Sequence, residues 1–146
     1  MDLQPMPDFH EEIAPWLLEC EFAKRVAALQ AFTNPLEGEK LHILMVGDPS
    51  SGKSDLMEYA ANLSPRHGVI GLRTSIPGLI DELESSDGGI VGIDEFDKLP
   101  RATRHNLLEM MEKGKVKITM KNINETIMCR ASVFAACNPR GSVIDE

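Results

Sequence analysis

Gly47-Asp48-Pro49-Ser50-Ser51-Gly52-Lys53-Ser54 is the stretch of sequence that decides the fold. It follows Leu41 to Val46, a nearly unbroken apolar run with the length of a buried strand, and it opens a helical pattern from Lys53 to Leu63. In this order, glycines let successive backbone N–H groups surround phosphate oxygens at the start of a helix. The stretch therefore predicts a loop that binds a nucleoside triphosphate, with ATP and Mg²⁺ as the expected ligands.

Each residue of this loop is a candidate binding residue. Lys53 is expected to contact the β- and γ-phosphates, and Ser54 is expected to bind Mg²⁺. The alternative is an ordinary glycine-containing turn between a strand and a helix. The apolar run before the loop and the helical pattern after it favour the phosphate-binding interpretation. The residues expected to line the nucleotide are Gly47, Asp48, Pro49, Ser50, Ser51, Gly52, Lys53 and Ser54.

A second apolar run, Ile90 to Ile93, ends in two adjacent carboxylates, Asp94 and Glu95. Because ligands of parallel sheets bind beyond the carboxyl ends of the strands, we expect both side chains to lie beside the loop. Asp94 is predicted to orient Mg²⁺ through its water shell. Glu95 is predicted to polarise the attacking water as a general base. An acidic pair by itself is more often a solvated surface feature, but its place at the end of a buried strand favours the site.

A third apolar run, Ser132 to Cys137, ends at Asn138 and Pro139. The Asn138 amide could hold the attacking water or the γ-phosphate, or Asn-Pro could simply start a turn. From the spacing alone, the two interpretations are equal.

The remaining pattern alternates strands with helices, which predicts an α/β domain with a parallel sheet. We expect one helix over residues 16–32, with Phe22, Val26 and Leu29 on its apolar side. Further elements are expected as a strand over His67–Leu72 and as helices over Pro77–Ser86 and Pro100–Lys113.

A β-hairpin is predicted after the last helix, because apolar and basic residues alternate from Lys115 to Lys121. The tight turn is expected at Asn122–Asn124. One face should carry Lys115, Lys117 and Lys121, and the other Val116, Ile118 and Met120. Lysines of this kind usually keep an exposed edge strand soluble.

Charge and composition narrow the functional classes. The chain has 146 residues and a net charge of −8, which argues against a stand-alone nucleic-acid binder, yet residues 113–130 carry a local charge of +4. No apolar stretch approaches the roughly 20 residues of a membrane span, and no secretory signal is visible.

The three cysteines form no Cys-x-x-Cys pair, which argues against disulfides and zinc, and no chemistry is assigned to the four histidines. The cytoplasm is the default compartment.

Together these motifs resemble the AAA+ module of the minichromosome maintenance (MCM) replicative helicases. Gly47 to Ser54 is similar to the Walker A motif of that family, with Gly52 where alanine is typical. Ile-Asp-Glu-Phe-Asp-Lys at residues 93–98 resembles its Walker B motif almost letter for letter. Residues 131–139 resemble its sensor 1 strand. The resemblance extends from about Ile13 to Asn138.

The resemblance implies a P-loop NTPase fold with a pre-sensor-1 hairpin, working with other AAA+ or MCM subunits in a hexameric ring. Asn138 would be the sensor 1 residue, and Ile13-Ala14-Pro15 would lie near the adenine. The hairpin would engage DNA through Lys115, Lys117 and Lys121. Such a protein would be nuclear in a eukaryote and cytoplasmic in an archaeon, a bacterium or the host of a virus.

The sequence also departs from the family. The segment from Gly71 to Gly89 is short, with little room for a helix-2 insert, and Met120 stands where the hairpin lysine is usual. The sequence stops at Glu146, before the arginine finger, the sensor 2 arginine and the helical lid. We therefore expect ATP hydrolysis only with a finger supplied in trans or by missing sequence. The isolated chain should turn ATP over very slowly.

Two alternatives stay open beside an ATPase module of a DNA helicase. One is a truncated MCM relative that serves as a nucleotide-dependent regulatory or structural subunit. The other is a protein remodeller similar to MoxR or the chelatases, against which Phe96-Asp97-Lys98 argues. In either case we expect a single domain, with residues 1–14 as a lead-in, 15–140 as the nucleotide-binding core and 141–146 as a tail.

Overall fold

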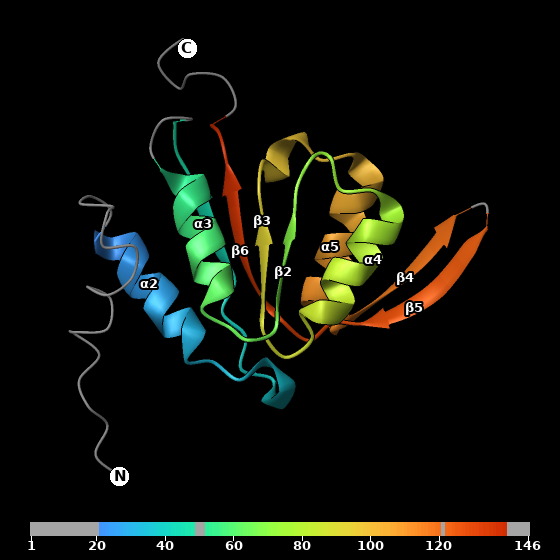
Figure 1. The fold of residues 1–146 in the computed structure, drawn as a ribbon, viewed down its shortest axis with the longest axis horizontal. Helices are drawn as coiled ribbons and strands as arrows, with labels where there is room; N and C mark the ends of the chain where they lie inside the picture. Colours follow the sequence, from blue (N-terminus) through green and yellow to red (C-terminus); the bar gives the residue numbers. More distant parts are fainter. Residues whose placement is uncertain (1–20, 49–51, 121, 140–146) are drawn as a thin grey trace.

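The computed structural model describes residues 21–48, 52–120 and 122–139 (Figure 1). Four strands form a parallel sheet in the order β1-β6-β3-β2. They are β1 (Ile43–Val46), β2 (His67–Ile70), β3 (Ile90–Ile93) and β6 (Ser132–Cys137). The predicted parallel α/β fold is confirmed. All four strands end at the same edge of the sheet, so the segments that follow them are brought together there.

Helices cover both faces of this sheet (Figure 1). On one face, side chains of α2 and α3 pack with Ile90, Phe134 and Ala136. On the other face, side chains of α4 and α5 pack with Val91, Ile93 and Val133. Alternate residues of the two inner strands, β3 and β6, therefore point into two separate cores. The helices are α2 (Glu21–Ala31), α3 (Lys53–Asn62), α4 (Ile76–Ser85) and α5 (Arg101–Lys113), with single 3₁₀ turns η2 (Pro35–Glu37) and η3 (Phe96–Lys98).

The predicted ends of most elements are right to within two residues. Strand β2 ends at Ile70, two residues before the predicted end. Helix α4 begins after Ser75, whose hydroxyl accepts a hydrogen bond from the Gly78 N–H at 3.2 Å. Helix α5 ends at Lys113 and is capped by Gly114, which has the left-handed conformation (φ 70°) that glycine adopts readily.

The prediction for the buried side of α2 was wrong. Phe22 and Leu29 are exposed by 81% and 48%, whereas the buried face carries Ala27, Ala28 and Gln30. Alanines allow α2 to approach α3 closely. The Gln30 amide donates hydrogen bonds to the carbonyl oxygens of Leu41 (2.8 Å) and Val133 (2.9 Å). Small apolar side chains and a buried amide therefore form this interface, and the large apolar residues Phe22 and Leu29 do not.

The expectation that the first strand is covered on both faces was also wrong. Leu44 and Val46 are exposed by 59% and 55%, while Ile43 and Met45 pack against the core beneath α2 and α3. Strand β1 is the edge strand of the sheet that the structure describes, and β6 is its neighbour there. Strand β3, at the centre, is buried at every position as expected.

A hairpin of β4 (Lys115–Met120) and β5 (Ile123–Met128) confirms the predicted two-stranded element, but its turn lies earlier than predicted. Met120 pairs with Ile123, so Ile123 and Asn124 belong to the second strand. Val116 and Ile118 are buried and Lys115 is exposed, as the alternation indicates. Met120 is 52% exposed instead of buried. Lys121 and the segment Ile13-Ala14-Pro15 lie outside the described residues.

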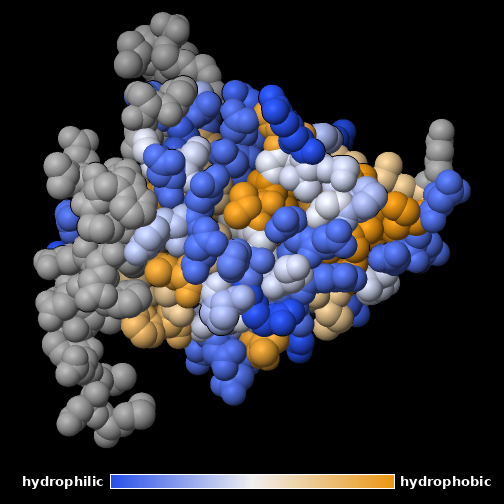
Figure 2. Space-filling view, viewed as in Figure 1, coloured by the Kyte–Doolittle hydropathy of each residue, from blue (hydrophilic) through white to orange (hydrophobic). Residues whose placement is uncertain are grey.

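The surface seen from this side is mostly hydrophilic, with hydrophobic residues where the hairpin meets the body of the molecule (Figure 2). Exposed Met120 and Met128 belong to the hairpin. Among the described residues, no helix has the length and apolar character that a membrane span needs.

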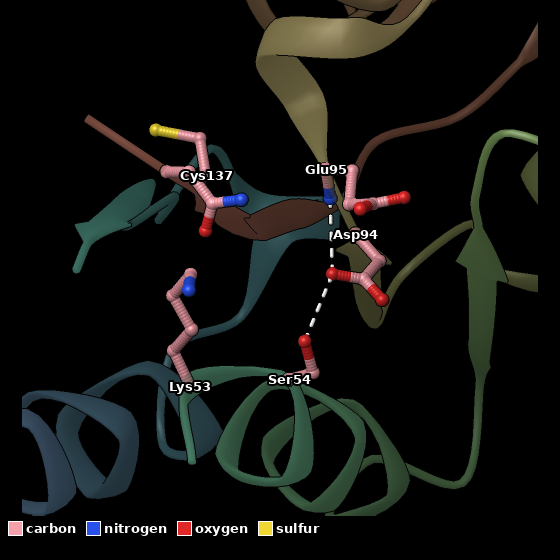
Figure 3. A pocket seen from close by; sticks show the side chains of 6 residues that line it. Lys53, Ser54, Asp94, Glu95 and Cys137 are labelled. Atoms are coloured by element: carbon pink, nitrogen blue, oxygen red, sulfur yellow. Dashed lines mark hydrogen bonds between the residues drawn. The ribbon is translucent and has the colours of Figure 1, made fainter. Parts of the chain in front are cut away.

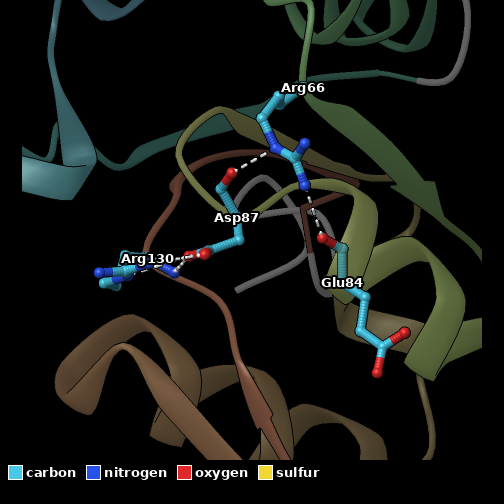
Figure 4. Close-up of polar contacts among 4 residues, drawn as sticks. All are labelled: Arg66, Glu84, Asp87 and Arg130. Carbon is cyan, nitrogen blue, oxygen red and sulfur yellow. Dashed lines mark hydrogen bonds and ion pairs between the residues drawn. The ribbon is translucent and has the colours of Figure 1, made fainter.

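The base of the hairpin is tied to the turn after α4 by an ion pair (Figure 4). The Asp87 carboxylate accepts hydrogen bonds from the backbone N–H, Nε and Nη2 of Arg130, at 2.7, 3.1 and 2.8 Å. From the other side, Arg66 donates to the carbonyl oxygens of Asp87 (2.7 Å) and Glu84 (3.3 Å). These contacts join the start of β2, the turn before β3 and the start of β6.

We expect Asp87→Asn to lower the melting temperature by a few degrees near neutral pH. The hydrogen bonds from Arg130 hold the pKa of Asp87 below its ordinary value of 3.8. A carboxylate whose pKa is lowered by folding stabilises the folded chain above that ordinary value, and this contribution disappears as the pH falls through the lowered pKa. The melting temperatures of variant and wild type should therefore begin to approach each other as the pH falls below about 3.8, and should meet only below the lowered pKa. Asp81→Asn, at an exposed position, is the control and should melt at the wild-type temperature. If Asp87→Asn and Asp81→Asn changed the melting temperature equally, the stabilising role of the Asp87–Arg130 ion pair would be contradicted.

Candidate functional site

The ends of three strands meet around one cavity at the carboxyl edge of the sheet (Figure 3). The cavity has a volume of about 90 Å³. Strand β3 leads into Asp94 and Glu95, strand β6 leads into Asn138, and α3 begins at Lys53. The lining residues are Lys53, Ser54, Asp94, Glu95, Cys137 and Asn138. The structure thus brings together five of the predicted site residues from three separate motifs.

The described part of the loop has the geometry of a helix start. The N–H of Gly47 donates to the carbonyl oxygen of Cys137 at 3.2 Å, which anchors the loop to β6. Gly52 has the left-handed conformation (φ 78°), and its carbonyl oxygen accepts the Leu56 N–H at 3.1 Å. Pro49, Ser50 and Ser51 lie outside the described residues.

Lys53 is a buried cation, only 4% exposed. Its Nζ donates a hydrogen bond to the backbone oxygen of Asp48 at 2.7 Å. A buried ammonium group is costly unless anions or several acceptors surround it. The position of Lys53 beside a polar cavity therefore suits an anionic ligand such as a phosphate group.

Ser54 and Asp94 form an oxygen pair across the cavity. The Ser54 hydroxyl donates to Asp94 Oδ1 at 3.0 Å, and the Glu95 N–H donates to the same oxygen at 2.9 Å. Hydroxyl and carboxylate oxygens are the protein ligands that Mg²⁺ prefers, and this ion commonly takes only one or two of them beside water and phosphate oxygens. The described residues contain no cluster of three or more His, Cys, Asp or Glu side chains that could hold a metal by themselves. The pair fits Mg²⁺ bound together with phosphates.

Glu95 has an unusual backbone conformation. With φ 49° and ψ 48°, it is the one described residue other than glycine with a positive φ. This left-handed region is unfavourable for residues with a Cβ atom. Its carboxylate lies 3.4 Å from Lys98 Nζ and points away from Lys53 (Figure 3).

Cys137 lines the cavity and was missed by sequence reasoning. The residue is 9% exposed. Burial raises the pKa of its thiol, nearby Asp97 adds to this effect, and Lys53 opposes it. The thiol is therefore protonated at neutral pH and serves as a wall of the site. Its place as the last residue of β6, directly before Asn138, was the available signal.

The candidate lysines of the hairpin, and His42, do not line this cavity. Lys115 and Lys117 belong to the hairpin, which projects from the side of the molecule where α4 and α5 lie (Figure 1). His42 has a structural hydrogen bond, because its Nδ1 accepts the Val133 N–H at 3.1 Å. Burial lowers the pKa of His42, which keeps this nitrogen free to accept.

Comparison with known proteins identifies the family. The model of the MCM P-loop domain matches residues 4–82 and 81–146. The chain belongs to the MCM family. The two matched segments meet inside α4, within the stretch from Gly71 to Gly89 that is short in the sequence.

Curated MCM proteins are similar to most of the chain. DNA replication licensing factor mcm4 of Schizosaccharomyces pombe is 35% identical over 157 aligned residues, covering 89% of this chain and 17% of the relative. MCM4 of Arabidopsis thaliana is 35% identical, with 97% of the chain and 20% of the relative covered. A probable DNA helicase MCM9 of Oryza sativa is also 35% identical, over 68% of the chain. The chain thus spans a fifth or less of the length of these relatives.

Proposed function

We propose that this chain binds ATP with Mg²⁺ and forms the ATPase module of an MCM-type DNA helicase. The observation that carries the proposal is the meeting of buried Lys53, the Ser54–Asp94 oxygen pair and Glu95 at one edge of the sheet. Membership of a P-loop family supports nucleotide binding at this edge.

Within this proposal, each side chain has a separate task. Lys53 holds the β- and γ-phosphates, and Ser54 with Asp94 holds Mg²⁺, which when bound neutralises charge on the phosphates. Glu95 takes a proton from water while the water oxygen bonds to the γ-phosphorus and the bond to the departing ADP oxygen breaks. Asn138 orients this water or the γ-phosphate.

Full turnover is proposed to need an arginine from a neighbouring subunit or from a longer chain. Of the described residues that line the cavity, Lys53 is the one cation. An arginine finger increases the rate of related NTPases by about 10³- to 10⁵-fold. The isolated chain is therefore expected to bind ATP well and to hydrolyse it very slowly.

DNA contact is proposed for the exposed lysine face of the hairpin. Lys115 and Lys117 are exposed there, and Lys121 is the residue after the last residue of β4, Met120. The local positive charge in an otherwise acidic chain suits a phosphate backbone. In a ring of like subunits, such hairpins would act together.

The test is Glu95→Gln, which keeps the shape of the side chain and removes its basicity. We expect the affinity for Mg·ATP to stay within about twofold, while the single-turnover hydrolysis rate falls at least about 100-fold. Calorimetric titration measures the first quantity and release of labelled phosphate the second. Glu84→Gln, a change of an exposed glutamate on α4, is the matched control and should leave both unchanged. An equal rate for Glu95→Gln and wild type would exclude Glu95 as the base.

Mixing the chain with a complete MCM protein distinguishes the proposed ATPase module from the alternative, a regulatory subunit. The proposed function predicts that mixing raises ATP hydrolysis and that the increase requires Glu95. ATP-dependent association on size-exclusion chromatography, with no contribution of Glu95 to hydrolysis, would favour the regulatory role.

A further inference from the structure

Gly92 lies inside the central strand β3, where a glycine normally weakens a sheet. The residue is buried, and it pairs with Val69 of β2 on one side and with Phe134 of β6 on the other. Its φ is not positive, so the backbone conformation does not require glycine here. The reason for a glycine at this position therefore lies in what packs against it.

Helix α3 occupies the space that a side chain at residue 92 would need. A Cβ atom on Gly92 would lie 2.5 Å from Sδ of Met57 and 3.3 Å from Cβ of Ala61, and both residues belong to α3. Non-bonded heavy atoms pack best at about 3.5–4.0 Å. Gly92 thus allows α3 to lie closer to β3 than a residue with a Cβ atom would.

The two neighbours of Gly92 cannot move aside independently of the helix. The Cβ atom of Ala61 is attached directly to the backbone of α3. Met57 has a flexible side chain, but it is completely buried in the core that α3 forms with Phe134 and Ala136. A close-packed core has no empty volume that the thioether could enter. A methyl group at residue 92 is therefore expected to push α3 away from β3.

The same helix and strand carry the Ser54–Asp94 oxygen pair (Figure 3). Asp94 follows Gly92 by two residues, so the two lie on the same face of the strand, the face toward α3. Ser54 precedes Met57 by three residues, which places both on one side of the helix. The Ser54 hydroxyl donates to Asp94 Oδ1 at 3.0 Å. The contact at Gly92 therefore lies next to the oxygen pair and sets the distance between its two members.

We propose that Gly92 is a positioning residue that holds the Ser54–Asp94 oxygen pair at the spacing suited to Mg²⁺, and that it thereby makes the site prefer Mg²⁺ to the larger Ca²⁺. Mg²⁺ requires oxygen ligands at about 2.0–2.1 Å in near-ideal octahedral geometry, whereas Ca²⁺ accepts about 2.3–2.6 Å in flexible geometry. A shift of about 0.3 Å is thus enough to change the preference. The inference rests on the proposed function, because it concerns the metal ion named there.

The binding test compares Mg·ATP with Ca·ATP by calorimetric titration of the full chain. Wild type should bind Mg·ATP more tightly. For Gly92→Ala, the affinity for Mg·ATP should fall about 10-fold, the lower end of the range for loss of a residue that orients metal ligands. The affinity for Ca·ATP should change by less than about twofold, because Ca²⁺ tolerates the wider spacing. Equal wild-type affinities for the two complexes, or an unchanged ratio of affinities in Gly92→Ala, would overturn the inference.

Gly68→Ala is the matched control for a clash inside the sheet. A Cβ atom at Gly68, in β2, would lie 2.5 Å from the backbone oxygen of Glu82 on α4, a helix that lines no part of the cavity. This variant should lose stability and keep the wild-type ratio of affinities. The double variant Gly92→Ala with Met57→Ala removes the obstructing thioether, so its ratio should return toward that of wild type. A ratio as low as in Gly92→Ala alone would show that the effect does not pass through α3. If Gly92→Ala does not fold, Met57→Phe enlarges α3 opposite Gly92 and should lower the ratio in the same way.

A second measurement does not depend on nucleotide binding. In a crystal structure of nucleotide-free Gly92→Ala, we expect the distance from Ser54 Oγ to Asp94 Oδ1 to exceed about 3.5 Å, beyond the reach of a hydrogen bond. An unchanged distance would refute the spacing role of Gly92. The two hypotheses can fail separately. A wild-type chain that binds no Mg·ATP would overturn the proposed function, whereas normal Mg·ATP binding with an unshifted metal preference in Gly92→Ala would overturn this inference alone.

Discussion

Lys53→Ala should lower the affinity of the chain for Mg·ATP by about 10- to 100-fold, the range expected for loss of a hydrogen bond to a charged group. The Lys53 residue is nearly inaccessible to solvent, and within the described residues its ammonium group donates one hydrogen bond, to the Asp48 backbone oxygen at 2.7 Å. Phosphate oxygens would add anionic partners to this backbone acceptor. The alanine variant removes these charge-assisted contacts and leaves the strand and helix on either side in place.

Two measurements distinguish lost binding from lost folding. Calorimetric titration gives the affinity directly. Thermal unfolding with and without Mg·ATP gives the stabilisation by the ligand, which depends on the ratio of ligand concentration to the dissociation constant. We expect the nucleotide-free variant to melt no lower than wild type, because a buried charge has been removed, and to lose most of the ligand-induced increase. Lys115→Ala, on the hairpin, is the control and should retain full affinity; equal affinity for Lys53→Ala and wild type would exclude the loop as the phosphate site.

The candidate site could be predicted from sequence because its residues belong to short local motifs. Lys53 and Ser54 follow a glycine at the start of a helix, and Asp94 with Glu95 directly follows a buried strand. Parallel strands end at one edge of a sheet, so separate motifs meet there without any knowledge of side-chain packing. The same reasoning could not find the ion pair between Glu95 and Lys98, which depends on a left-handed backbone conformation at Glu95.

The features that sequence reasoning missed depend on contacts between distant segments. Gln30 hydrogen bonds to Val133, 103 residues away, and Asp87 binds Arg130, 43 residues away. Neither contact leaves a periodic pattern in the chain. The exposed side of α2 illustrates the same point, since Phe22 looks like a core residue while Ala27 and Ala28 pack more closely. Hydrophobic periodicity predicts a helix, but it does not predict which side of the helix packs against a neighbouring helix through small residues.

Gly89→Ala should have the largest effect on stability, lowering the free energy of unfolding by about 3 kcal/mol. A Cβ atom at this position would lie 1.6 Å from the carbonyl oxygen of Arg66 and 2.5 Å from Ser64 Oγ. The carbonyl cannot move freely, because it accepts the Ile90 N–H at 3.1 Å. Gly89 in turn accepts the Ser132 N–H at 3.0 Å, so any backbone shift disturbs β2, β3 and β6 together. Urea denaturation, analysed for midpoint and slope, measures the loss.

Gly71→Ala provides the matched comparison for this change. A Cβ atom at Gly71 meets nothing within 4 Å, so the variant should be as stable as wild type or slightly more stable, because alanine restricts the unfolded chain. If the urea midpoint of Gly89→Ala equalled that of Gly71→Ala, the three strands could move apart at this end with no loss in the free energy of unfolding. A strong loss would have a further consequence at the site, because Asp94 and Glu95 lie at the far end of β3. Displacement of β3 should then weaken nucleotide binding even in the fraction of molecules that remains folded, which calorimetric titration below the unfolding transition would detect.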